Sequence, residues 1–86
     1  MTSHLNANAN PAAQTFGERA VGLSFNPSGD DAVTKIKRQF AQIIDTLNDE
    51  RVRRGPGEVG RMLSLAITEA QTAQMWAVKA VTWREA

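Results

Sequence analysis

Arg51-Val52-Arg53-Arg54-Gly55-Pro56-Gly57-Glu58 is the stretch that decides the fold, because it separates two long segments with helical character. Cations over residues 51–54 suit the C-terminal end of a helix, where they meet the negative pole of its dipole. Gly55-Pro56-Gly57 cannot continue that helix, since proline lacks an N–H and glycine favours turns. The chain therefore reverses here, and two helices joined by so short a connection are antiparallel neighbours.

The segment before this turn has the period of an amphipathic helix. Its apolar residues recur at spacings of three and four: Val33, Ile36, Phe40, Ile43, Ile44 and Leu47. Asn26-Pro27-Ser28-Gly29 stops regular structure ahead of it, and Asp30 or Asp31 supplies an N-cap. The pattern predicts a first helix over about residues 31–52.

The segment after the turn is rich in good helix formers and has no proline. It predicts a second, longer helix over about residues 58–84. One stripe along this helix is made of small residues at heptad-like spacing: Leu63, Ala66, Ala70, Ala73, Ala77 and Ala80. Further apolar residues lie on other faces, which is more apolar surface than one partner helix can cover.

The N-terminal part of the chain has weaker patterns. Residues 1–15 are dominated by Ser, Asn, Ala, Gln and Thr and predict a flexible arm. Residues 16–25 alternate weakly and contain two glycines, which favours an extended segment lying on another surface. The predicted fold is therefore all-α: an antiparallel two-helix hairpin with an extended N-terminal segment, forming one domain over residues 16–86.

Size argues for self-association. A chain of 86 residues and 9.4 kDa makes one small domain, and it has no cysteine to form a disulfide. A bare two-helix hairpin buries too little surface to fold alone. We therefore expect a homo-oligomer.

Composition excludes several classes of function. The net charge is only +1, and the one histidine, His4, lies in the polar arm. Without cysteine or further histidine, the usual nucleophiles and zinc ligands are missing, so we expect no enzyme, no metal site and no cofactor. No apolar run reaches the roughly 18 residues that cross a bilayer, and no targeting signal is evident. We expect a cytosolic protein with no membrane or nucleic-acid polymer as partner.

The antiparallel register gathers candidate binding residues at one end of the hairpin. Counting outward from Gly55 brings the loop after Phe25 close to Lys79, Trp83 and Arg84. Lys37 lies near the positive end of the first helix and near Phe25, a combination suited to a phosphate plus a base. The alternative is that Phe25 and Trp83 cover the end of the hydrophobic core.

A second candidate is a polar stripe on the second helix that includes Thr68, Gln71 and Lys79. This stripe either forms the wall of a polar pocket, or is a solvated face whose polar groups bond across a subunit interface.

Two segments, residues 25–37 and residues 66–83, resemble the small helical-hairpin sponge proteins of phages. That family counters CBASS and Thoeris immunity by sequestering cyclic nucleotide messengers. The resemblance implies a homohexamer of hairpins that binds cyclic dinucleotides at subunit interfaces without degrading them. Some relatives also bind cyclic trinucleotides or cyclic ADP-ribose isomers. It further implies a location in the cytoplasm of the infected bacterial host.

The resemblance also implies roles for individual residues. Phe25 matches an aromatic position that stacks on a base, and Lys37 matches a lysine that contacts phosphate. Loop contacts carry over to Asn26 and Ser28, and Thr68 lies in the part of the second helix that lines a trinucleotide pocket in relatives.

Two classes of function remain open at this point. The first is a sponge for cyclic dinucleotides such as cyclic GMP-AMP. The alternative is a structural or nucleic-acid-associated oligomeric hairpin whose basic residues touch phosphates. The near-neutral charge and the absence of tyrosine favour the sponge.

Overall fold

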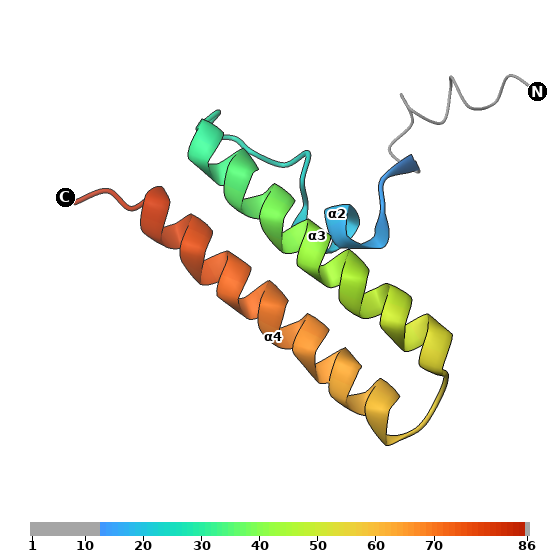
Figure 1. The fold of residues 1–86 in the computed structure, drawn as a ribbon. Coiled ribbons are helices and arrows are strands. Elements are labelled where there is room, and N and C mark those ends of the chain that lie inside the picture. The colour runs from blue at the N-terminus through green and yellow to red at the C-terminus, as the bar shows by residue number, and fades with distance from the viewer. Residues whose placement is uncertain (1–12, 86) are drawn as a thin grey trace, which may run out of the picture.

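The computed structural model describes residues 13–85, and these form a helical hairpin with a short helix packed against it. The elements are α2 (Phe16–Val21), α3 (Asp31–Arg54) and α4 (Glu58–Val81). Figure 1 shows α3 and α4 side by side and antiparallel, joined by the turn at residues 55–57. The described residues contain no strand, so the predicted all-α hairpin is confirmed. The predicted arm over residues 1–15 lies mostly outside the described residues.

Local chemistry explains where α3 and α4 begin and end. Asp30 is the N-cap of α3, and its Oδ1 accepts a hydrogen bond of 2.8 Å from the Ala32 N–H. The helix then continues to Arg54, two residues past the predicted end, and stops at Gly55 with φ of 77°. α4 ends at Val81, three residues short of prediction, where the Thr82 hydroxyl donates to the Val78 carbonyl.

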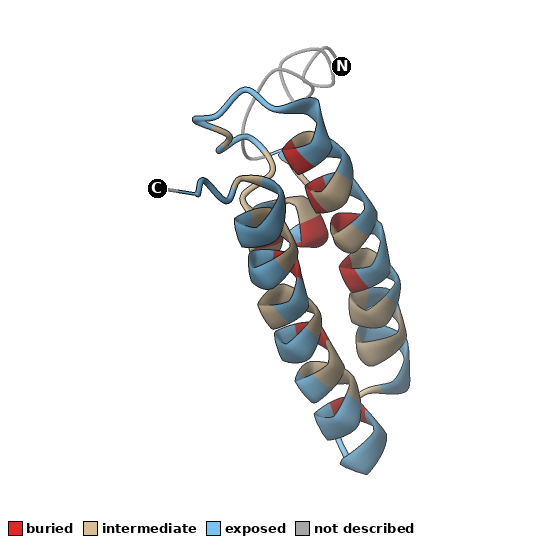
Figure 2. Cartoon of the chain, turned by 90° about the vertical axis from the view of Figure 1, so that its left-hand side faces the viewer, coloured by how far each residue is buried: buried red, intermediate tan, exposed pale blue. Residues whose placement is uncertain are grey.

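The core lies where the three helices meet. Val21 of α2, Ala41 and Ile44 of α3, and Ile67 of α4 are buried together. Figure 2 shows the buried residues on the facing sides of α3 and α4, with the outer faces exposed. None of the described helices combines the length and the apolar character needed to span a membrane.

The small-residue stripe of α4 only partly faces the core of the hairpin. The fully buried residues of α4 are Gly60, Ile67 and Gln74, whereas Ala73 and Ala80 of the stripe are exposed. Ile67 carries the contact because a branched apolar side chain fills the space between two helices better than alanine does. The stripe is therefore divided: Ala70 packs against the core, whereas Ala73 and Ala80 are left on the surface.

The prediction that residues 16–25 are extended is wrong for Phe16–Val21, which is the helix α2. A capping box starts it: the Thr15 hydroxyl accepts from the Glu18 N–H, and the Glu18 carboxylate accepts from the Thr15 N–H, both at 3.0 Å. Gly22, with φ of 62°, ends the helix in the left-handed region. These caps and tertiary packing outweigh the low helix propensity of Gly17.

α2 is held against α3 through its backbone. The Gly17 N–H donates to the Asp45 carboxylate at 2.7 Å, and a Cβ at Gly17 would lie only 2.1 Å from the Ala41 carbonyl oxygen. Glycine is therefore required for this approach. The Arg51 guanidinium lies 5.5 Å from the Phe16 ring centre, and the Gln71 amide donates to the Ala20 carbonyl at 3.3 Å.

Replacing Gly17 with alanine should push α2 away from α3. We expect Gly17→Ala to lower the free energy of unfolding by about 1–3 kcal/mol, because the clash is with backbone atoms that cannot change rotamer. Denaturant unfolding followed by circular dichroism measures this. Ser24→Ala, which removes an exposed hydroxyl from the same segment, should change it by less than about 0.5 kcal/mol. Equal stability of Gly17→Ala and the parent would contradict the close approach.

Candidate ligand-binding site

A tight turn after α2 places Phe25 beside α3. The Leu23 N–H donates to the Glu18 carbonyl at 3.0 Å, and the Phe25 N–H donates to the Gly22 carbonyl at 2.9 Å. The turn directs the Phe25 ring outward, and 69% of this residue is exposed. An exposed phenyl ring on a fixed turn is a surface on which a planar group can stack.

Lys37 lies beneath this turn and is almost completely buried, with 6% of its surface exposed. Its ammonium donates to the carbonyls of Gly22 at 2.9 Å and Phe25 at 2.5 Å. The same nitrogen lies 5.6 Å from the centre of the Phe25 ring. Two carbonyls and an aromatic face thus compensate the buried charge. One of the three ammonium N–H groups is left for another acceptor.

The loop from Asn26 to Asp30 is held by its own side chains. The Asn26 amide donates to the Asp30 carbonyl at 2.9 Å and to the Thr34 hydroxyl at 3.1 Å. The Ser28 hydroxyl donates to the Asn26 amide oxygen at 2.7 Å and accepts from the Asp30 N–H at 3.1 Å. Asn26 and Ser28 therefore shape the loop before any ligand arrives.

These elements enclose a hollow of about 220 Å³ between the loop and the end of α4. Four predicted site residues line it, namely Phe25, Asn26, Ser28 and Lys37. The other lining residues are Pro27, Val33, Val78 and Thr82. A neighbouring hollow of about 580 Å³ shares Phe25 and Lys37 and adds the predicted Lys79. The antiparallel register does bring the loop and the end of α4 together.

A comparison with protein families identifies the chain. The family described as "Acb2/Tad1, hairpin domain" matches residues 18–82, about three quarters of the sequence. The chain belongs to the Acb2/Tad1 hairpin family. Its members are sponges for the cyclic nucleotide signals of CBASS and Thoeris immunity, and they bind these signals rather than act as enzymes. The family resemblance inferred from residues 25–37 and 66–83 is confirmed. Searches of curated proteins and of solved structures gave no match.

In this Acb2/Tad1 hairpin, two predicted site residues do not line either hollow at Phe25. These are Thr68 and Gln71. Thr68 is exposed about three helical turns before Lys79, and its hydroxyl donates to the Ser64 carbonyl of its own helix. Gln71 is partly buried and bonds the Ala20 carbonyl, so its amide joins α4 to α2.

The threonine hydroxyls of α4 bond within the helix, and the aromatic side chains at this end are exposed. The hydroxyls of Thr68, Thr72 and Thr82 all donate to carbonyls four residues earlier in α4, so the helix itself satisfies them. Phe25 and Trp83 do not cover the core, because 69% and 60% of these residues are exposed.

Gln74 lines the candidate site, although the sequence did not single it out. Only 5% of it is exposed, and it lines the larger hollow together with Lys37 and Lys79. Gln74 is buried because it lies on the inner side of α4. The alanine pattern had pointed to a different side of this helix. The clue in the sequence was that Gln74 lies seven residues after Ile67, and therefore on the same side of the helix.

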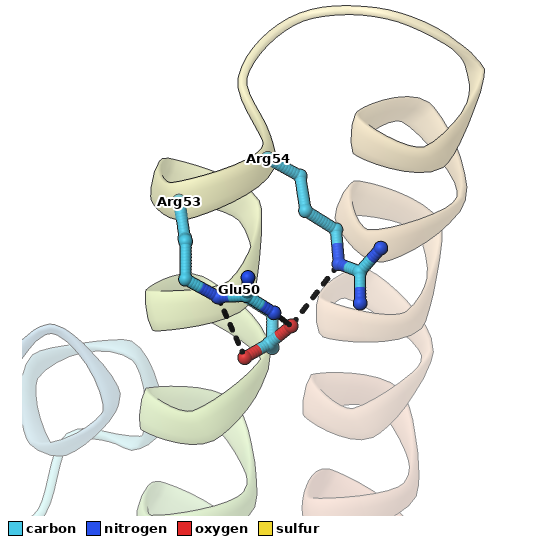
Figure 3. A network of polar contacts seen from close by, with 3 residues as sticks. All are labelled: Glu50, Arg53 and Arg54. Carbon is cyan, nitrogen blue, oxygen red and sulfur yellow. Dashed lines mark hydrogen bonds and ion pairs between the residues drawn. The ribbon is translucent and has the colours of Figure 1, made fainter.

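The arginines at the hairpin turn lie at the opposite end of the molecule and are mostly paired. Figure 3 shows Glu50 accepting from Arg53 and Arg54, with ion-pair distances of 2.5 and 3.1 Å. Hydrogen bonds from Arg53 and then Arg54 lower the pKa of the Glu50 carboxyl. Arg61 likewise lowers the pKa of Glu58. These exposed pairs offset part of the positive charge at this end, since Glu50 is shared by two arginines and Glu58 pairs with Arg61.

Replacing Lys37 should destabilise the turn that contains Phe25. We expect Lys37→Met to lower the free energy of unfolding by about 1–3 kcal/mol, because the Gly22 and Phe25 carbonyls lose their shared donor. Lys35→Met removes the same charge from an exposed position of α3 and is the matched control. Chemical denaturation of both variants gives the comparison. Equal stability of the two would show that the ammonium does not fasten the turn.

Proposed function

We propose that this protein sequesters cyclic oligonucleotide messengers, in particular cyclic dinucleotides such as cyclic GMP-AMP, and returns them chemically intact. The observation that carries the proposal is the exposed Phe25 ring above the buried Lys37 ammonium, at the mouth of a hollow. Stacking on an aromatic ring and attraction to a cation are the two interactions that a base joined to a phosphate requires. The site of action that we propose is the cytoplasm of the infected bacterial host.

The predicted ligand residues have different parts in this proposal. Phe25 stacks on a base, and Lys37 both holds the turn and offers its remaining N–H to a phosphate. Asn26 and Ser28 fix the loop along the edge of the ligand. Gln71 acts indirectly through α2, while Thr68 would serve only a separate site for a cyclic trinucleotide.

Binding without turnover is supported by the residue types available. Cleavage of a phosphodiester needs a positioned base, acid or metal. The chain has no cysteine and one histidine, His4, and residues 13–85 hold no cluster of three potential metal ligands.

A homohexamer is part of the proposal, and the apolar surface left uncovered by the hairpin supports self-association. Ile43 and Val52 of α3, and Met62 and Leu65 of α4, are each at least half exposed. Exposed apolar patches of this kind mark interaction surfaces. A cyclic dinucleotide has approximate two-fold symmetry, so a two-fold interface would present Phe25 and Lys37 twice to one ligand.

Recovery of the ligand after binding tests the function. The full chain should deplete free cyclic GMP-AMP from solution, and heating the complex should return it unchanged on chromatography. Phe25→Ala should weaken binding in titration calorimetry by about 1–3 kcal/mol, because a stacking surface is lost. Thr46→Ala, on an exposed face of α3, should bind like the parent. Light scattering of all three proteins checks that assembly is the same.

Three results would contradict the proposal. Linear nucleotide in the recovered material would mean cleavage, and no depletion by the parent would mean no sponge. Unchanged affinity of Phe25→Ala would remove Phe25 from the site.

A further inference from the structure

The smaller hollow beside Phe25, of about 220 Å³, has room for one part of a cyclic dinucleotide. Pockets that hold a whole drug-sized molecule measure roughly 300–1,000 Å³. Val33 of α3 and Val78 of α4 give this hollow apolar walls. A hydrogen bond made between such walls is stronger than one made in open water. The polar groups of the lining can therefore decide which part of a ligand enters.

Backbone groups fix the direction of the side-chain hydrogen bonds in the loop. The Asp30 carbonyl can only accept, so the Asn26 group 2.9 Å from it is the NH₂, whose second hydrogen goes to Thr34. The Asp30 N–H can only donate, so the Ser28 oxygen accepts from it and the Ser28 hydrogen goes to the Asn26 oxygen. The side-chain hydrogens of Asn26 and Ser28 are thus already in use.

Thr82 is fixed in the same way on the α4 side of the hollow. Its hydroxyl oxygen lies 2.7 Å from the Val78 carbonyl oxygen. A carbonyl can only accept, so the hydroxyl hydrogen is used within the helix and lone pairs are what remain. Thr82 is partly buried and lines the hollow. It therefore offers a ligand an acceptor and no donor.

Lys37 is the one described side chain in this lining that still has a hydrogen to donate. Two of its three N–H groups are bonded to backbone carbonyls of the turn. The other polar side chains of the lining, on Asn26, Ser28 and Thr82, have only lone pairs to offer. One cationic donor among acceptors suits a ligand that brings a phosphate and a hydrogen-bond donor together.

We propose that this hollow selects its ligand by a hydrogen-bond donor, and that Thr82 accepts from that donor. The amino group of a purine and the hydroxyl of a ribose are donors that a cyclic dinucleotide can bring. Asn26 and Ser28 hold the loop, whereas Thr82 approaches from α4 and is free for recognition. The inference rests on the proposed function, since it names the part of the same ligand that enters the hollow. In a two-fold assembly each copy supplies its own Thr82 to its own half of the ligand.

Ligand analogues that each lack one donor test the proposal on the parent protein. Titration calorimetry compares cyclic GMP-AMP with three analogues. One has inosine for guanosine and lacks the guanine amino group, one has purine riboside for adenosine and lacks the adenine amino group, and one has deoxyribose for both riboses. The analogue without the recognised donor should bind about tenfold more weakly, and it tells whether a base or the sugar supplies that donor. Equal affinity for all four ligands would overturn the proposal.

Variants of Thr82 connect this preference to one oxygen atom. Thr82→Val keeps the shape of the side chain and removes the acceptor, so it should bind cyclic GMP-AMP as weakly as the discriminating analogue. Thr82→Ser keeps the hydroxyl and should retain the preference of the parent. Thr72→Val is the matched control, because the Thr72 hydroxyl makes the same bond within α4 and lines neither hollow at Phe25. A Thr82→Val protein that still discriminates would overturn the role of Thr82.

The outcomes separate this inference from the function. If the parent binds cyclic GMP-AMP and its analogues equally well, the sponge function stands and selection by a donor is wrong. If the parent binds no cyclic nucleotide, both are wrong. Should Thr82→Val change the oligomer in light scattering, Thr82→Ala removes the same acceptor with a smaller side chain and decides the matter.

Discussion

The buried ammonium of Lys37 is the interaction on which the ligand-facing end of the molecule depends. It joins α3 to the turn after α2 through the carbonyls of Gly22 and Phe25. A lysine is rarely buried unless its charge is compensated, and here the turn itself supplies the compensation. The same contact fixes the backbone of Phe25, from which the ring projects. Charge, loop geometry and the exposed aromatic surface are therefore one structural unit.

That unit needs a firm support, which the helix contacts provide. Gly17 lets α2 approach α3 until its N–H reaches Asp45, and this sets where the following turn begins. The α3–α4 hairpin then brings Val78, Lys79 and Thr82 to the same end. The hairpin leaves apolar residues such as Met62 and Leu65 exposed, which is the surface that the proposed self-association would cover.

The sequence predicted features that depend on local chemistry. Asp30 as an N-cap and Gly55-Pro56-Gly57 as a reversal are short-range patterns, and the antiparallel count from Gly55 placed Phe25 near Lys79. The helix α2 was missed although Thr15 and Glu18 form a visible capping box, because Gly17 lowers its helix propensity and Gly22 follows directly after it. The burial of Lys37 and Gln74 depends on side-chain directions set by three packed helices, and periodicity alone cannot supply these.

A structure of the full chain bound to cyclic GMP-AMP would show directly which end of the molecule holds the ligand. We expect one purine stacked on Phe25, with the Lys37 ammonium still bonded to the Gly22 and Phe25 carbonyls. A ligand seated at the hairpin turn beside Arg51, or a Lys37 side chain withdrawn from both carbonyls, would contradict it.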